Sequence, residues 1–272
     1  VAATNVNKRC LMDEIRLQDC YINRYGPAYM TGTQALVRLL LEQARLDREQ
    51  GINSRGLVSG YPGSPLGELD LELNHNLDLL EKDGVTFQPA INEELAATAI
   101  WGSQHIHLYD QPEIDGVFGL WYGKGPGLDR ALDAIRHANM GGVAKYGGMV
   151  LAVGDDATGK SSTLAYQSEQ TFIAAGVPFF YPRSIHDIIP MGLQAFALSR
   201  LAGCCVGMKI VVDTADASSI IDLDRIRPEI TANDESGPVH IGRHDPALVR
   251  EDRLFNFRLP AVRRFQKAQN IN

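Results

Sequence analysis

Two short segments of the chain combine residue types that can hold a ligand and move a proton. Tyr61-Pro-Gly-Ser-Pro65 is rich in Gly and Pro, so a ligand can approach its backbone closely. Asn92-Glu-Glu-Leu-Ala96 places a carboxylate, Glu93, at the start of a helical pattern. The apolar residues that follow are expected to bury this helix deeply, and burial raises the pKa of a carboxylate towards the range useful for proton transfer. The two segments therefore predict a ligand-binding crevice that contains an acid–base residue.

The same glutamate also has a purely structural interpretation. Acidic side chains in the first turn of a helix stabilise the helix dipole, and Asn92 is a favourable capping residue. The residues alone leave both interpretations open.

A third segment, Gly123-Lys-Gly-Pro-Gly127, follows an apolar run at residues 116–120. Its composition predicts a tight loop after a strand. If the three segments lie at the same sheet edge, they share one crevice and Lys124 meets an anionic group. The alternative is a solvated surface lysine.

Residues 154–161 match the phosphate-binding pattern that ends in Gly-Lys-Ser, with Lys160 and Ser161 as its last positions. Such a loop would make the chain a nucleotide hydrolase, with Asp213 as a magnesium ligand. Two features oppose this alternative. Two aspartates inside the pattern would repel phosphate, and poor helix formers follow Lys160 although the motif must open into a helix.

Composition and charge exclude other classes of protein. The 272 residues carry a formal net charge of −7 and are 44% hydrophobic, which is typical of a soluble globular protein and unfavourable for nucleic-acid binding. No apolar stretch reaches the about 18 residues of a membrane span, and the first residues lack a secretion signal. The cysteines and histidines have no metal-ligand spacing, so we expect no metal site and a cytoplasmic location.

The elements that must position the candidate residues alternate along the chain. Strands are expected at residues 56–59, 85–87, 116–120, 149–153, 177–180 and 206–212, with helices between them at about residues 33–51, 67–82, 92–105, 128–140, 167–176 and 186–202. This alternation predicts an α/β fold with a doubly wound parallel sheet. Beyond residue 216 we expect a charged loop, a short strand at residues 239–241 and a terminal helix from about residue 246. The predicted domain organisation is an irregular lead-in (1–29), one domain (30–215) and a C-terminal extension (216–272).

Several segments occur in the same order in one known family. They are Thr31-Gly-Thr-Gln-Ala-Leu-Val-Arg38, Ser59-Gly-Tyr-Pro-Gly-Ser-Pro-Leu-Gly67, residues 92–104, residues 116–127, Arg136-His-Ala-Asn139, and Gly154-Asp-Asp156 through Lys160-Ser-Ser-Thr163. Together they resemble the pyrimidine-binding domain of the 2-oxoacid:ferredoxin oxidoreductases, and most closely the long fused forms of the indolepyruvate ferredoxin oxidoreductase branch.

The resemblance implies a thiamine diphosphate enzyme that oxidatively decarboxylates a 2-oxo acid to an acyl-CoA and passes electrons to ferredoxin. Glu93 matches the family's glutamate that hydrogen-bonds the aminopyrimidine ring of the cofactor. The residues matched to the cofactor's surroundings are Pro62, Gly63, Ser64, Asn92, Gly125, Pro126 and Gly127. Ser161, Ser162 and Glu169 match a further segment near the mouth of the family's active site, and Lys124 is a further candidate near the substrate.

Two features of the family are missing from this sequence. It has neither the Gly-Asp-Gly type motif that grips the diphosphate through Mg²⁺ nor a cysteine run for an iron–sulfur cluster. We therefore expect Mg²⁺ and [4Fe-4S] clusters on other domains or subunits. The chain should therefore contribute only half of the cofactor-binding site. We expect it to be a fragment or a separate subunit that is inactive alone and belongs to a dimeric assembly. The implied partners are the diphosphate-binding part, coenzyme A and ferredoxin, with an arylpyruvate as substrate by analogy. A non-catalytic assembly subunit of the same fold is the alternative.

Overall fold

The computed structural model describes residues 16, 18–160, 164–232 and 237–271. A six-stranded parallel sheet forms its centre, in the spatial order β3-β2-β4-β5-β7-β6. The strands are β2 (Ser54–Gly60), β3 (Val85–Phe87), β4 (Gly116–Lys124), β5 (Met149–Asp155), β6 (Phe179–Phe180) and β7 (Cys205–Val211). This is the predicted α/β fold with a parallel sheet.

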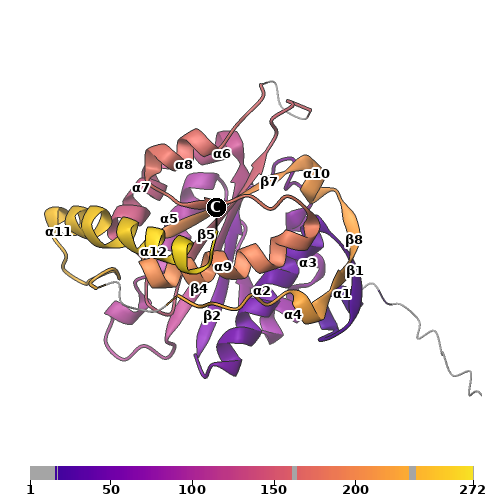
Figure 1. The fold of residues 1–272 in the computed structure, drawn as a ribbon, viewed down its shortest axis with the longest axis horizontal. Helices are drawn as coiled ribbons and strands as arrows, with labels where there is room; N and C mark the ends of the chain where they lie inside the picture. Colours follow the sequence, from indigo (N-terminus) through magenta and orange to yellow (C-terminus); the bar gives the residue numbers. More distant parts are fainter. Residues whose placement is uncertain (1–15, 17, 161–163, 233–236, 272) are drawn as a thin grey trace, which may run out of the picture.

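Helices cover both faces of the sheet (Figure 1). One layer contains α2 (Gly32–Glu49), α3 (Leu69–His75), α4 (Leu77–Lys82) and α9 (Ile185–Ala202), and the other contains α5 (Glu93–Ser103), α6 (Gly125–Arg130), α7 (Leu132–Gly141) and α8 (Glu169–Ala175). Neighbouring residues of a strand point to opposite faces. Leu120 and Tyr122 of β4 accordingly pack into the first core, and Trp121 packs into the second. Burial on both faces explains why β4 and β5 are almost continuously apolar.

The chain order of the strands creates a topological switch point. From β2 the chain crosses to β3 on one side and then returns to β4 on the other side of β2. In such sheets the loops that leave the two diverging strands separate, and a crevice opens outside their carboxyl ends. The segments after β2, β3 and β4 therefore meet at one place.

Several predicted elements have different bounds in the structure. The helix expected at 67–82 is two helices, α3 and α4, which meet at Asn76. The prediction of a loop at residues 123–127 is wrong, because β4 continues to Lys124 and α6 begins at Gly125. Proline is well tolerated in the first turn of a helix, where its missing N–H is not needed, so Pro126 does not prevent this.

The amino-terminal part contains regular structure that the sequence did not indicate. Helix α1 (Asp19–Ile22) precedes β1 (Pro27–Thr31), which pairs antiparallel with β8 (Ser218–Asp222), a strand in the region expected to be a charged loop. Alternate residues of β1 are buried, among them Met30, so this segment contributes to the core. The domain boundaries at residues 30 and 215 stay predictions.

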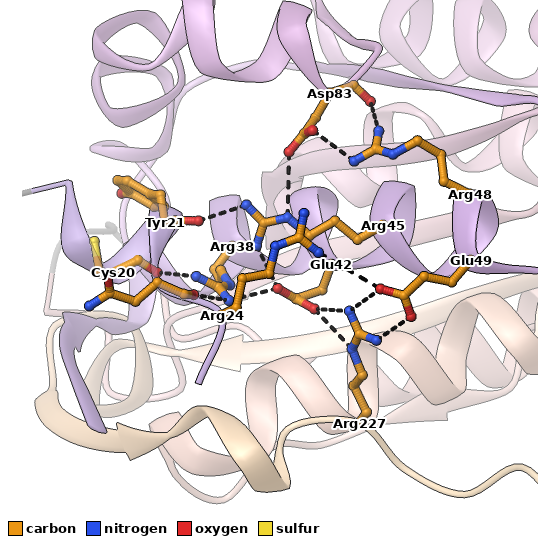
Figure 2. Close-up of polar contacts among 11 residues, drawn as sticks. Cys20, Tyr21, Arg24, Arg38, Glu42, Arg45, Arg48, Glu49, Asp83 and Arg227 are labelled. Atoms are coloured by element: carbon orange, nitrogen blue, oxygen red, sulfur yellow. Dashed lines mark hydrogen bonds and ion pairs between the residues drawn. The ribbon is translucent and has the colours of Figure 1, made fainter. Parts of the chain in front are cut away.

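An arginine-rich network fixes this segment to α2 (Figure 2). Arg38 and Arg45 donate to the carbonyl oxygens of Cys20 and Tyr21 at 2.9 and 2.8 Å. Both arginines also pair with the buried Glu42 carboxylate at 2.7 Å, and Arg227 donates to its other oxygen at 2.9 Å. Burial alone would raise the pKa of Glu42, but the guanidinium groups outweigh it and lower the pKa.

No strand forms at residues 239–241, where one was expected. The backbone carbonyls of Val239 and His240 accept hydrogen bonds from the side chains of Arg258 and Arg253 instead of from a strand. These arginines lie on the terminal helix, which runs through α11 (Ala247–Asp252), a π-helical turn (Arg253–Arg258) and α12 (Leu259–Ala268). The remaining short elements are α10 (Val212–Ala215) and two 3₁₀ turns, Ile106–Leu108 and Leu223–Arg225. Within the described ranges, no helix has both the length and the apolarity to cross a membrane.

Candidate active site

A cleft of about 470 Å³ opens at the topological switch point. The segments that follow β2, β3 and β4 line it, and their lining residues are Tyr61, Pro62, Gly63, Ile91, Asn92, Glu93, Lys124, Pro126, Gly127 and Arg130. The volume lies within the range of small-molecule sites in proteins. The cleft thus joins the three segments that the sequence analysis singled out.

The start of α5 holds Glu93 in place. The Asn92 side chain caps the helix, because its Oδ1 accepts a hydrogen bond from the Leu95 backbone N–H at 2.8 Å. The buried Trp121 indole Nε1–H donates to the Glu93 backbone carbonyl at 2.9 Å. A helix cap and a core tryptophan therefore fix the backbone from which the Glu93 side chain extends.

The Glu93 side chain extends towards α6 and is 15% exposed. A β-carbon at Gly127 would come within 2.6 Å of Glu93 Oε1, so the absence of a side chain at residue 127 is what admits the carboxylate. Arg130, one helical turn later, places its Nε 3.9 Å from Glu93 Oε2, beyond hydrogen-bond distance. Within the described ranges, no hydrogen bond reaches the carboxylate oxygens of Glu93.

The Gly/Pro segment forms another wall of the cleft. The Tyr61 backbone N–H donates to the Tyr122 carbonyl at 3.2 Å, which continues the β2–β4 pairing into this segment. A β-carbon at Gly63 would lie 3.1 Å from Lys124 Cβ, so the lysine stem packs against the glycine. Pro65 packs against Gly154 at the end of β5. The segment is thus supported by two neighbouring strands.

The expected deep burial of α5 is only partly correct. Ala96, Ala97 and Ile100 are buried against the sheet, but Leu95 is 48% exposed and Ala99 is half-buried. Ile91, just before the helix, is 82% exposed. An exposed apolar surface therefore borders the cleft, because the carboxyl edge of the sheet is not covered here.

Not all predicted site residues line this cleft. Those that do are Pro62, Gly63, Asn92, Glu93, Lys124, Pro126 and Gly127, whereas Ser64 and Gly125 lie next to it. The Tyr166 ring packs on Gly125, where a β-carbon would come within 2.0 Å of it. Ser161 and Ser162 lie outside the described residues. The binding roles of all these residues stay predictions.

Glu169 belongs to a separate ionic cluster in the structure. Lys209 Nζ donates to Glu169 Oε1 at 2.5 Å and lies 3.2 Å from the buried Asp155 Oδ2. Burial would lower the pKa of Lys209, but the two carboxylates outweigh burial and raise it. Asp155 also accepts hydrogen bonds from the Ser168 N–H and Oγ–H at 3.0 Å. This cluster joins β5, β7 and the start of α8, and Glu169 does not line the cleft.

The nucleotide-hydrolase alternative finds no support in the structure. After β5, the first helix within the described ranges is α8, which begins only at Glu169. Asp155 and Asp156 are buried, and Asp156 Oδ1 accepts a hydrogen bond from the Lys160 backbone N–H, a group that a phosphate loop would aim at its ligand. Among the described residues, no three His, Cys, Asp or Glu side chains lie close enough together to hold a metal ion.

Sequence reasoning missed three residues that shape the site. Trp121 lies within the 116–127 segment but was given no role of its own, and only its hydrogen bond to the Glu93 carbonyl shows its positioning role. Ile91 lies between predicted elements. Arg130 would have been found if α6 had been predicted to start at Gly125, because residues three apart on a helix share a face.

Comparisons with known proteins agree with this fold and with the motifs. No protein-family model matches the chain. The indolepyruvate oxidoreductase subunit IorA of Pyrococcus horikoshii is 24% identical over 205 residues, which are 74% of this chain and 27% of that protein. The structure of 2-oxoglutarate:ferredoxin oxidoreductase from Magnetococcus marinus, with 2-oxoglutarate, coenzyme A and succinyl-CoA bound, is similar in fold with a TM-score of 0.55.

That second match has 16% sequence identity and covers 75% of this chain and 32% of the other chain, so it supports the fold alone. The chain thus spans about a quarter to a third of the length of these relatives. Together with the collinear motifs, the match to IorA supports the resemblance of this chain to the 2-oxoacid:ferredoxin oxidoreductase family, on its indolepyruvate branch, and the structural match agrees with the fold.

Proposed function

We propose that the Glu93 cleft is the pyrimidine-binding half of a thiamine diphosphate site in a 2-oxoacid:ferredoxin oxidoreductase. The observation that carries this proposal is the contact between the Glu93 carboxylate and the bare backbone of Gly127, beside the Pro62–Gly63 turn. The whole enzyme would convert an aryl 2-oxo acid, such as indolepyruvate, to its acyl-CoA with ferredoxin as electron acceptor. This finer activity is a proposal for the complete protein, which would act in the cytoplasm.

The residues of the cleft fit an aminopyrimidine ring. The Glu93 carboxylate is mostly shielded from water, faces the cleft, and has acceptor capacity left for a ligand. Gly63, Gly127 and Pro62 present backbone and small apolar surface, against which a flat ring can lie closely. When bound, thiamine diphosphate supplies the carbon centre that attacks the 2-oxo group and takes up the electrons released with CO₂.

In this proposal Glu93 holds the proton of a ring nitrogen and returns it during the reaction. A general acid–base residue of this kind contributes about 10²–10⁴-fold to the rate. The Asn92 cap and Trp121 keep the Glu93 backbone from shifting, and Gly127 leaves room for its carboxylate. The exposed apolar side chains of Ile91 and Leu95 would be covered by the part of the enzyme that binds the diphosphate and Mg²⁺. Iron–sulfur clusters would belong to further domains or subunits, and the whole would form a dimer.

The test is turnover of 2-oxo acids by the complete enzyme that carries Glu93→Gln. The substitution keeps the size of the side chain and removes its ability to exchange a proton, so kcat should fall by about 100-fold or more. Glu94→Gln is the matched control, because Glu94 is the exposed neighbour in the same helical turn. Normal turnover by Glu93→Gln would contradict the proposal. If the wild-type complete protein has no turnover, the alternative of a non-catalytic assembly subunit gains support.

A further inference from the structure

The Gly/Pro wall of the cleft is held by a buried tyrosine that does not itself line the cleft. Tyr122 lies near the end of β4, and its side chain is fully buried. Its backbone carbonyl accepts the Tyr61 N–H at 3.2 Å, where the Gly/Pro segment leaves β2. Its phenol hydroxyl donates to Asp70 Oδ1 on α3, where the same segment has ended. One residue therefore holds both ends of the chain between residues 61 and 70.

Backbone hydrogen bonds connect Asp70 to the wall of the cleft. The Leu66 N–H donates to the Gly63 carbonyl at 2.8 Å, and the Leu69 N–H donates to the Leu66 carbonyl at 3.2 Å. The side chains of Leu66 and Leu69 are fully buried. Asp70 directly follows Leu69, so a shift of Asp70 would be passed on to the turn that carries Gly63 into the cleft.

Tyr122 also contacts the strand from which the Gly/Pro segment starts. A β-carbon at Gly60 would come within 2.2 Å of the Tyr122 carbonyl oxygen and within 2.4 Å of its ring, so the tyrosine lies directly on the glycine. The Gly60 carbonyl accepts the Ala90 backbone N–H at 3.1 Å, three residues before Glu93. Tyr122 is thus in contact with the origin of one cleft wall and one hydrogen bond away from the chain that leads to Glu93.

The hydrogen bond from Tyr122 compensates for the partial burial of Asp70. Burial raises the pKa of Asp70, and the hydrogen bond from the phenol opposes this rise. A half-buried carboxylate that loses its donor gains free energy by turning towards water. Loss of the Tyr122 hydroxyl should therefore release the start of α3 and the turn that precedes it.

We propose that the hydrogen bond between Tyr122 and Asp70 positions the cleft for its cofactor, because it fixes the wall formed by Pro62 and Gly63 relative to Glu93. This rests on the proposed function, in which a flat ring lies against that wall and meets the carboxylate. Tyr122 and Asp70 are positioning residues, since neither lines the cleft. Their loss should weaken cofactor binding without removing any group that touches the cofactor.

A second phenol–carboxylate pair on the same helix provides the matched control. The Tyr21 hydroxyl donates to Glu72 Oε1, and the Tyr21 side chain is fully buried as well. Asp70 and Glu72 are two positions apart on α3, so their side chains lie on different sides of the helix. Tyr21→Phe removes the same hydroxyl group from a buried ring but leaves both hydrogen bonds of Tyr122 intact.

Hydrogen–deuterium exchange of the complete protein measures the positioning without any ligand. Tyr122→Phe should raise the exchange rates of the Leu66 and Leu69 amides about tenfold, as expected for the loss of a hydrogen bond to a charged group. Tyr21→Phe should leave these rates within about twofold of the wild type. Unchanged rates in Tyr122→Phe would overturn the proposal, and so would an equal rise in both variants, which would mean that any loss of contact to α3 has this effect.

Titration of the complete enzyme with thiamine diphosphate and Mg²⁺ connects the turn to the cleft. Tyr122→Phe should raise the Kd about tenfold, and Tyr21→Phe should not change it. Asp70→Asn keeps an oxygen that can accept the phenol hydrogen, so its Kd should stay within about threefold of the wild type. An unchanged Kd in Tyr122→Phe would overturn the proposal. If the wild type binds no thiamine diphosphate, the proposed function fails, and the exchange rates alone decide whether Tyr122 and Asp70 position the wall.

Discussion

The Glu93 carboxylate lies directly against the α-carbon of Gly127, where a β-carbon would approach Glu93 Oε1 and Cγ to 2.6 Å. The two residues are 34 positions apart and come from different strand–helix junctions. Their contact connects the start of α5 to the start of α6, so the position of the carboxylate depends on a residue that has no side chain.

Gly127→Ala should therefore displace the carboxylate. Because the Glu93 side chain is flexible, it can rotate away from the added methyl group at little cost in the free energy of unfolding. A misplaced catalytic group still lowers the rate, by about 100-fold for a shift of 1 Å. Turnover of the complete enzyme and a thermal melt measure the two effects. Gly102→Ala on α5 is the control, since a β-carbon there meets nothing within 4 Å. Equal turnover in both variants would contradict this explanation.

Asn92→Ala should weaken the start of α5. The Asn92 side chain accepts a hydrogen bond from the Leu95 backbone N–H. Loss of such a helix cap lowers the free energy of unfolding by about 1 kcal/mol. Urea unfolding measures this change. Asn92→Ser supplies another capping oxygen and should lose less. A loss in Asn92→Ser as large as in Asn92→Ala would show that the cap is not the cause.

The Glu42 network predicts a specific loss of stability in acid. The buried carboxylate has a pKa below its ordinary value of 4.5, because the surrounding arginines outweigh burial. A lowered pKa in the folded state means that the stabilisation is complete above about pH 5 and decreases as the pH falls below 4.5. The free energy of unfolding should therefore fall more steeply between about pH 5 and 3 in the wild type than in Glu42→Gln.

The same variant should be about 3 kcal/mol less stable than the wild type at pH 7, since it leaves buried arginines without their charge partner. Urea unfolding at a series of pH values tests both points. The exposed Glu81→Gln is the control and should follow the wild-type curve. An identical pH slope in Glu42→Gln would exclude Glu42 as the titrating group.

Much of the fold could be predicted because strands that are buried on both faces appear as apolar runs. The run at 149–153 became β5, and the alternation with helical patterns indicated the parallel sheet. The antiparallel β1–β8 pair could not be predicted in this way. Its strands are 187 residues apart from the end of one to the start of the other, and each exposes one face, so neither has a continuous apolar pattern.

The candidate site was partly predictable for the same reason. Glu93 and the 61–65 turn were found because both follow strands, and topology brings such junctions together. The Gly-rich segment at 123–127 was assigned to a loop because glycine and proline usually interrupt helices. Here the segment is helical from Gly125, and glycine at position 127 leaves room for the Glu93 carboxylate, a tertiary requirement that no local pattern records. Glu169 was assigned to the site by resemblance, whereas its pairing with Lys209 depends on packing between α8 and β7.

Proton exchange at the reactive carbon of thiamine diphosphate tests the central role of Glu93 most directly. In the complete enzyme, nuclear magnetic resonance can follow the replacement of that carbon-bound proton by deuterium. Glu93→Gln should slow this exchange by about 100-fold or more relative to the wild type and to Glu94→Gln. Exchange in Glu93→Gln as fast as in the wild type would contradict the account.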